Sequence, residues 1–207
     1  MLEERGLEAA GLECERGGRM LFRNLSIFIK NGDLIRVSGA NGSGKTSLLR
    51  ILCGLLTPAA GEVRWKGTTI GGLREEYSRD LVYLGHAPAV KDDLTASENL
   101  SITCLLAGNP VQEKSIQEAL GRFGLRDKDI ILKKLSQGQR RRAALARLCV
   151  SNNVPLWFLD EPFAALDKEA LKLTEGLIAG HVANGGSVVY TTHQDDALGA
   201  GRVVDLG

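Results

Sequence analysis

Residues 39–46 constrain this chain more than any other stretch, because they fit the pattern G-x-x-x-x-G-K-[ST] at every fixed position. In such a loop the glycines let consecutive backbone N–H groups surround a polyphosphate. The lysine reaches the β- and γ-phosphates, and the threonine hydroxyl binds Mg²⁺. We therefore predict that the chain binds a nucleotide. The loop consists of Gly39, Ala40, Asn41, Gly42, Ser43, Gly44, Lys45 and Thr46.

The segments that flank this loop have the form that such a site needs. Residues 34–38 are typical of a strand, and the apolar run that begins at Ser47 is typical of a helix. The N-terminus of that helix would add the positive end of its dipole to the phosphate site. We expect Ser47 to contribute to nucleotide binding as well.

A second set of candidate residues ends the stretch from 155 to 161, where an apolar run leads into Asp160 and Glu161. The run predicts a buried parallel strand whose acidic end lies at the carboxyl edge of the sheet, where open α/β folds bind ligands. There Asp160 would hold Mg²⁺, and Glu161 would orient and deprotonate the attacking water. The alternative is a solvent-exposed strand end, which the phosphate-binding loop in the same chain disfavours.

A pentapeptide at residues 135–139 precedes a helix-like run over residues 141–150. On its own it could be an ordinary helix start with Ser136 as the N-cap. Its place between the phosphate-binding loop and the acidic strand makes a functional role more plausible than an ordinary helix start. This signature pentapeptide consists of Leu135, Ser136, Gln137, Gly138 and Gln139.

The rest of the chain divides into a strand-rich beginning and a helical middle. Residues 7–38 alternate between apolar and polar in short pieces, which predicts an antiparallel subdomain that leads into the loop strand. Residues 94–131 are typical of helices, and Thr95 and Glu98 have the spacing of a capping box.

With these motifs in this order, the chain resembles the ABC-type ATPase family over nearly its whole length. Residues 165–167 are similar to the D-loop of that family, and His193 is similar to its switch histidine, after a strand at residues 187–191. The resemblance implies an α/β fold of the P-loop NTPase class. It has a mostly parallel core sheet, an N-terminal antiparallel β-subdomain and an inserted helical subdomain at about residues 90–150. Residues 1–207 would form a single ATP-binding domain.

The same resemblance implies the chemistry. ATP is the substrate, with Mg²⁺ bound by Thr46 and Asp160, and the reaction is ATP hydrolysis coupled to transport. Glu161 and His193 are the catalytic residues, the histidine through a hydrogen bond to the γ-phosphate, and Asp167 belongs to the D-loop. The signature pentapeptide acts in trans on the nucleotide of a second copy. The chain would then form a homodimer on ATP binding, and hydrolysis would release it.

Composition restricts the partners and the location. The chain has 207 residues, of which 43% are hydrophobic, and its net charge of +1 indicates no general attraction to nucleic acid. Its apolar runs are much shorter than the ~20 residues that span a bilayer, so we expect no direct membrane insertion. The N-terminus lacks a segment of signal-peptide type. Scattered cysteines indicate free thiols in a reducing compartment.

Two positions depart from the family pattern. Where the family often has an aromatic residue that stacks on adenine, this chain has Arg16. Its guanidinium either lies against the base or is a solvated surface charge. Where a glutamine is expected after the strand that ends at Leu84, the chain has Ala87. Alanine has no polar side-chain group, so this contact is lost unless His86 or a water replaces it.

A finer resemblance is to the ATP-binding subunits of haem exporters in bacterial cytochrome c maturation. It implies integral membrane subunits that handle haem, and a location at the cytoplasmic face of the bacterial inner membrane. An ABC ATPase for another cargo is the main alternative. A cassette acting on ribosomes or DNA usually carries a second cassette or a basic extension, and a small-molecule kinase would leave the signature pentapeptide unexplained. The finer resemblance rests on Glu15-Arg16, Gly85-His86 with Pro88, Leu94-Thr95-Ala96 with Glu98-Asn99-Leu100, and Thr192-His193-Gln194.

Overall fold

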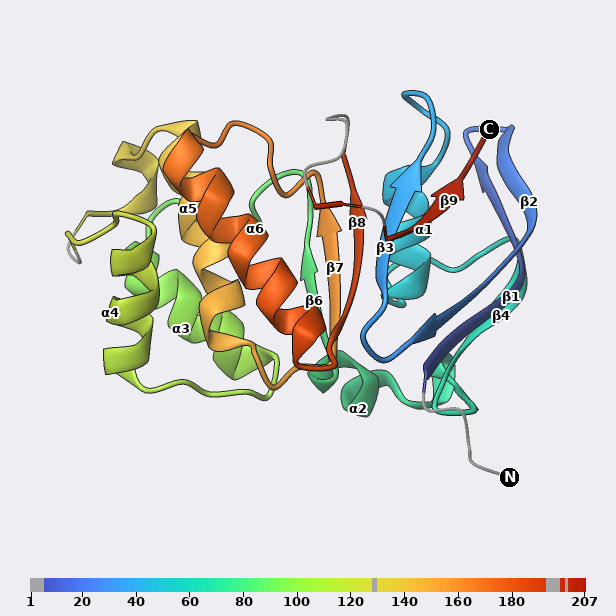
Figure 1. Ribbon diagram of the computed structural model, residues 1–207, viewed down its shortest axis with the longest axis horizontal. Coiled ribbons are helices and arrows are strands. Elements are labelled where there is room, and N and C mark those ends of the chain that lie inside the picture. Colours follow the sequence, from blue (N-terminus) through green and yellow to red (C-terminus); the bar gives the residue numbers. More distant parts are fainter. Residues whose placement is uncertain (1–5, 128–129, 193–197, 200) are drawn as a thin grey trace.

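A five-stranded parallel sheet forms the centre of the molecule (Figure 1). The structure is a computed structural model and describes residues 6–127, 130–192, 198–199 and 201–207. The strand order is β6-β7-β8-β3-β9, and every residue of β7 and β8 is buried, as expected for inner strands covered on both faces. The strands are Leu34–Ser38 (β3), Leu81–Leu84 (β6), Leu156–Asp160 (β7), Ser187–Thr191 (β8) and Arg202–Asp205 (β9).

A four-stranded antiparallel sheet lies to one side, in the order β2-β1-β4-β5. The register of β1 shifts around Gly11, which has a φ of 60°. Gly61 on β4 comes so close to this bulge that a Cβ there would collide with the carbonyl of Gly11, so only glycine fits. The strands are Gly6–Arg16 (β1), Arg19–Lys30 (β2), Ala60–Trp65 (β4) and Thr68–Thr69 (β5).

Helix α1, Lys45–Leu52, lies between the two sheets (Figure 1). Its Leu48 and Leu49 share a hydrophobic core with Leu7 of β1 and Phe158 of β7. Burial on both sides fixes the start of α1, and therefore the loop before it, against the parallel sheet. The short helix α2, Arg74–Arg79, precedes β6.

The remaining helices cover the opposite face of the parallel sheet (Figure 1). Trp157 and Leu159 of β7 point to this side and pack in a second core with Leu100 and Ile178. The side chains of β7 thus alternate between the two cores, as the pleat of a strand requires. The helices are Ala96–Leu106 (α3), Glu113–Arg122 (α4), Gln137–Leu145 (α5) and Lys168–Ala183 (α6); the 3-10 helices are Ile70–Gly72, Leu132–Lys134 and Ala146–Val150.

The fold class is the one that the sequence predicts, but the expected helix bounds need correction. Helix α5 begins at Gln137, earlier than expected, and gives way to 3-10 geometry after Leu145. The segment from 94 to 131 is not continuously helical. It contains two helices with a break between them, because Gly108 adopts a φ of 75° and a proline follows at position 110.

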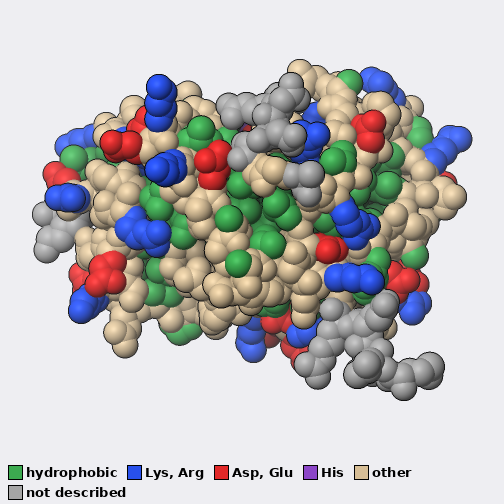
Figure 2. All heavy atoms as spheres, viewed as in Figure 1, with side chains coloured by type: hydrophobic (Ala, Val, Ile, Leu, Met, Phe, Trp, Pro, Cys, Tyr) green, Lys and Arg blue, Asp and Glu red, His purple; other side chains and the backbone are tan. Residues whose placement is uncertain are grey.

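Several smaller features complete the fold. Thr95 and Glu98 form the predicted capping box at the start of α3. The cysteines are free, and all but Cys149 are buried. Among the described residues, no helix is long and apolar enough to cross a membrane, and no three His, Cys, Asp or Glu side chains gather as a metal site. Figure 2 shows positive and negative side chains interspersed over the face in view.

Candidate functional site

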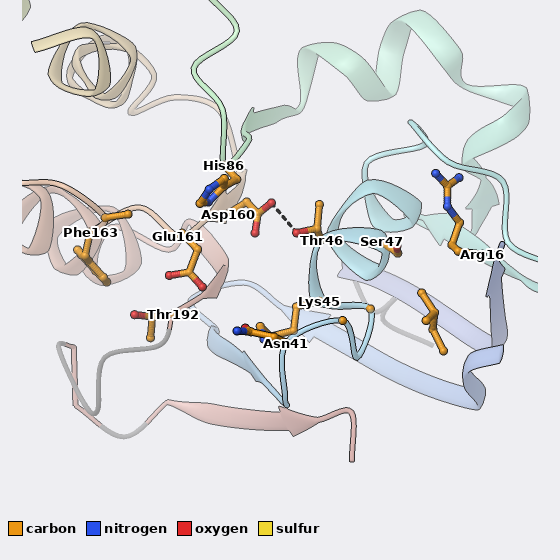
Figure 3. Close-up of a pocket in the computed structure, with 14 residues that line it drawn as sticks. Arg16, Asn41, Lys45, Thr46, Ser47, His86, Asp160, Glu161, Phe163 and Thr192 are labelled. Carbon is orange, nitrogen blue, oxygen red and sulfur yellow. Dashed lines mark hydrogen bonds between the residues drawn. The ribbon is translucent and has the colours of Figure 1, made fainter. Parts of the chain in front are cut away.

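A cavity of about 640 Å³ opens at the carboxyl edge of the parallel sheet (Figure 3). The loop after β3, the ends of β6, β7 and β8, and the β1–β2 hairpin all contribute to it, because parallel strands bring their carboxyl ends to one edge. The lining residues are Arg16, Leu21, Asn41, Gly42, Gly44, Lys45, Thr46, Ser47, His86, Asp160, Glu161, Phe163, Ala164 and Thr192.

The loop between β3 and α1 depends on glycine for its shape. Gly44 caps α1 with a φ of 107°, and a Cβ at this position would lie 3.1 Å from side-chain atoms of Leu21 and Phe22. Gly39 has a φ of 141°, and a Cβ there would press against Ser43. These backbone conformations are ones that only glycine adopts readily.

Lys45 is 8% exposed, and its ammonium lies over the loop, where Nζ donates to the carbonyl oxygens of Gly39 at 2.7 Å and Ala40 at 3.1 Å. The buried hydroxyl of Ser43 has no hydrogen-bond partner among the described residues. A phosphate on the loop would satisfy that hydroxyl and give the lysine a charge-assisted partner. The loop therefore fits a polyphosphate.

Asp160, at the end of β7, is 1% exposed and is held by two hydroxyls. Its Oδ2 accepts a hydrogen bond from Thr46 Oγ1 at 2.8 Å, drawn as the dashed line in Figure 3, and its Oδ1 accepts one from Thr191 Oγ1, also at 2.8 Å. A carboxylate beside a threonine hydroxyl, next to a phosphate-binding loop, is a donor set that suits Mg²⁺. Thr46 and Asp160 therefore fit the metal that the fold implies.

Glu161 follows directly and has a φ of 52°, in the left-handed region. This conformation costs a non-glycine residue roughly 1–2 kcal/mol, so the surroundings must hold it. Its N–H donates to Thr191 Oγ1 at 2.9 Å, and its carbonyl accepts from Arg141 Nη2 at 2.6 Å. In Figure 3 the Glu161 carboxylate and the Lys45 side chain enter the same open space.

Comparisons with known proteins identify the family. The ABC transporter family model matches residues 22–164. The chain belongs to the ABC transporter family. It is 53% identical over 190 residues to the "Cytochrome c biogenesis ATP-binding export protein CcmA" of Aromatoleum aromaticum, a match that covers 91% of this chain and 89% of that protein. With the protein of the same name from Nitrosospira multiformis it shares 52% identity, over 97% of both chains.

Solved structures agree with this family. An ABC transporter ATP-binding protein from Pyrococcus furiosus is 25% identical and superposes with a TM-score of 0.82, over 97% of both chains. A bacterial ABC transporter cassette solved as a dimer gives a TM-score of 0.84 at 23% identity, over 97% of this chain and 95% of that one, and so shows the same fold. The chain is thus an ATP-binding cassette, of the family that couples ATP hydrolysis to transport.

The signature pentapeptide of this cassette lies apart from its own phosphate-binding loop, and none of its residues lines the cavity. Ser136 and Gln139 form a capping box at the start of α5, with reciprocal bonds of 2.9 and 3.2 Å. Gly138 faces the carbonyl of Ala165, which a Cβ on the glycine would approach to 3.3 Å. Ser136 thus has the N-cap role, and both Ser136 and Gln137 are exposed.

The other motif residues occupy different places. Asp167 caps α6 by accepting from the N–H of Ala170 at 2.8 Å, and it pairs with Arg142 at 3.4 Å. His193 lies outside the described residues, although Thr192 just before it lines the cavity. Arg16 lies at the opposite end of the cavity from Glu161 (Figure 3).

Sequence reasoning missed Arg141, one of three consecutive arginines in the chain. It is 4% exposed, and its guanidinium binds the backbone carbonyls of Asp160 and Glu161 as well as two carbonyls after β6. Burial lowers the pKa of this guanidinium, and the negative charges of the same two acids oppose that shift. No sequence signal separates it from Arg140 and Arg142, which are only partly buried. Leu21, Phe163 and Ala164 also line the cavity without having been predicted.

Proposed function

We propose that this chain is the ATP-hydrolysing subunit of the haem exporter of cytochrome c biogenesis, and that it dimerises on ATP to drive membrane subunits. The observation that carries the proposal is the identity of about half of its residues, over most of its length, with relatives named as cytochrome c biogenesis ATP-binding export proteins. The cavity supports the ATPase part, because it places Lys45, Thr46, Asp160 and Glu161 around one space.

The proposed reaction divides between the two sides of that cavity. The loop N–H groups and Lys45 bind the phosphates of ATP, and Thr46 and Asp160 hold Mg²⁺, which neutralises charge on the phosphate oxygens. Glu161 accepts a proton from the water that attacks the γ-phosphate. Fixed dipoles and charges cost no reorganisation during the reaction.

Further residues take supporting roles in this proposal. Ser47 adds a contact at the start of α1, and Arg16 lies flat against the adenine at the outer end of the cavity. His193 binds the γ-phosphate. His86 lines the cavity where Ala87 cannot contribute, and it supplies the polar group beside Asp160 that the expected glutamine would give.

The position of the signature pentapeptide supports a dimer. It begins α5, whose first N–H groups attract anionic oxygens, and Ser136 is exposed. We propose that Ser136 and Gly138 contact the γ-phosphate bound by the partner, with the D-loop at Asp167 nearby. Closure on ATP and opening after hydrolysis would form a switch that one phosphate controls.

The assembly would place the chain at the cytoplasmic face of the bacterial inner membrane. The chain as a whole, residues 1–207, acts as one domain, with the helical subdomain at about 90–150 inserted in the α/β core. Those subunits handle haem in this proposal, and the cassette itself contacts neither haem nor nucleic acid.

The test is deletion of the gene in its host, followed by staining of membrane proteins for covalently bound haem. Complementation uses the wild type and Lys45→Ala. Loss of c-type cytochromes that only the wild type restores supports the proposal and shows that the role needs ATP. Cytochromes that persist unchanged would assign the cassette to another cargo, which the membrane proteins that co-purify with it would then identify.

A further inference from the structure

Arg141 joins two separate segments at the edge of the parallel sheet. Its Nη1 donates to the carbonyl oxygens of Gly85 at 2.7 Å and His86 at 3.3 Å, and its Nη2 donates to those of Asp160 at 2.9 Å and Glu161 at 2.6 Å. All four bonds go to backbone oxygens, so they fix the course of the main chain rather than neutralise a carboxylate. The segments that Arg141 joins are the ones that present His86, Asp160 and Glu161 to the cavity.

The effect on Glu161 is the most direct. Its backbone is held from both sides, at the N–H by Thr191 and at the carbonyl by Arg141. A glutamate with a φ of 52° persists only where neighbours hold it, and this φ sets the direction in which its carboxylate enters the cavity. Arg141 is therefore placed to control the orientation of the Glu161 carboxylate.

The same side chain belongs to the helix that the signature pentapeptide begins. Arg141 follows the N-cap, Ser136, by five residues, which is about 7.5 Å along an α-helix. The helix start also contacts the D-loop, through Gly138 against Ala165 and through the ion pair of Arg142 with Asp167. A displacement of α5 would thus be transmitted to the carbonyl of Glu161 through the side chain of Arg141, five residues after the N-cap.

We propose that Arg141 is a positioning residue, through which the orientation of the Glu161 carboxylate depends on the position of α5. In the dimer, the signature pentapeptide contacts the nucleotide of the partner, so Arg141 links that contact to the base in its own site. The inference rests on the proposed function, because it requires Glu161 to act as the base and the signature pentapeptide to act in trans.

The test compares steady-state ATP hydrolysis by the wild type, Arg141→Lys and Arg141→Gln. The lysine ammonium keeps the charge but cannot bridge both pairs of carbonyls. The glutamine amide can neither bridge them nor carry the charge. We expect kcat to fall at least about tenfold for the lysine variant and further for the glutamine variant, because small misalignments of a base are costly. The KM for ATP should change less than about threefold, since Arg141 lies outside the phosphate-binding loop.

A double-mutant cycle with Glu161→Gln separates positioning from a general structural role. If Arg141 acts through Glu161, Arg141→Lys should not lower the residual hydrolysis of Glu161→Gln any further. ATP should still trap the dimer in the double variant, since the signature pentapeptide is intact. Equal fold losses in both backgrounds, or an unchanged kcat in the wild-type background, would overturn the proposal.

Arg147→Gln is the matched control, because Arg147 lies on the 3-10 helix after α5 and burial lowers the pKa of its guanidinium as well. It should reduce the thermal midpoint and leave kcat within about twofold of the wild type. If both Arg141 variants lose the cooperative thermal transition, Arg141 is needed for folding as a whole and the proposal fails. A wild type no more active than Lys45→Ala would instead overturn the proposed ATPase function, and the inference with it.

Discussion

The two walls of the cavity are built by different means. The loop wall, residues 39–46, takes its shape from its own glycines, which have φ values that other residues avoid. The strand wall, formed by the segments after β6 and β7, is held by side chains from elsewhere, namely Arg141 and Thr191. A binding surface can thus come from one short segment, whereas Glu161, the proposed base, is held by tertiary contacts.

Lys45→Ala should have the largest combined effect, on ATP binding and on hydrolysis together, because it removes the only side-chain charge of the loop wall. Without it the phosphates lose their charge-assisted donor, and we expect hydrolysis to fall by at least about a hundredfold, with weaker ATP binding. A phosphate-release assay and equilibrium binding of a fluorescent ATP analogue measure the two effects. Wild-type hydrolysis by this variant would show that the loop wall is not the binding surface.

Glu161→Gln should separate the two walls most clearly. The amide keeps the shape of the side chain but cannot accept the proton, so turnover should fall by about 10²–10⁴-fold while ATP binding remains. With ATP retained, the closed dimer should accumulate and be visible by size-exclusion chromatography. Hydrolysis at the wild-type rate would mean that another residue is the base.

Thr191→Val should affect the strand wall by removing the hydroxyl that holds Asp160 and Glu161. The threonine hydroxyl donates to Asp160 Oδ1 and accepts from the Glu161 N–H, so valine leaves two buried polar groups without their partner. We expect a loss of roughly 1–3 kcal/mol in unfolding free energy for such groups. Turnover should fall more than nucleotide affinity. Thr191→Ser, which keeps the hydroxyl, is the control, and an equal loss for both variants would show that the lost methyl matters more.

Ser136→Arg should act on the dimer rather than on either wall. The bulky charge at the exposed start of α5 should block closure, so hydrolysis falls toward the rate of an isolated cassette while the affinity of a single site stays within about twofold. Concentration-dependent hydrolysis of the wild type provides the comparison. If the variant hydrolyses ATP as fast as the wild type does, the signature pentapeptide does not act in trans.

His181 offers the smallest effect and belongs to neither wall. It is 4% exposed and stacks on Trp157 with ring centroids 3.8 Å apart, and burial lowers its pKa to about 4 from the ordinary 6.5. The unfolded chain therefore binds the proton more readily between these values, so stability is lost as the pH falls from about 6.5 toward 4. The slope from one such group is less than about 1.4 kcal/mol per pH unit.

Urea unfolding at pH 7.5 and pH 5 measures this effect. His181→Phe keeps a ring against Trp157 and removes the proton, so its stability should depend less on pH than that of the wild type. Measuring both proteins at pH 7.5 first subtracts any change in packing. An equal pH dependence of the two proteins would mean that another group causes it. A change in kcat in His181→Phe would show that packing around His181 affects the strand wall.

The sequence predicted the parts of the molecule that short segments determine. The loop wall, the strands β3, β7 and β8 and the capping box at Thr95 follow from glycine geometry, apolar runs and side-chain spacing. The fold class also followed, because the motifs resemble one family in order and spacing.

What the sequence did not predict is set by packing between distant segments. Successive helix positions point in directions about 100° apart, so three adjacent arginines must differ in burial, but only the tertiary fold decides that Arg141 is the buried one. Phe163 lies in a turn between β7 and α6, where no periodicity applies. The break in the helical region has a local cause, because Gly108 and Pro110 both disfavour a helix interior.

The sheet order has a consequence for how the protein is made. Strand β3 lies between β8 and β9, with Leu34 opposite Val188 and Ile35 opposite Arg202. At translation rates of about 5–20 residues per second, the loop wall emerges from the ribosome roughly 8–30 s before its neighbouring strands. During that interval β3 has neither of its neighbours, so a chain stalled after α6 should bind a nucleotide analogue more weakly than the complete chain does. Both edges of β3 therefore stay open to pairing with other strands until β8 and β9 have been made.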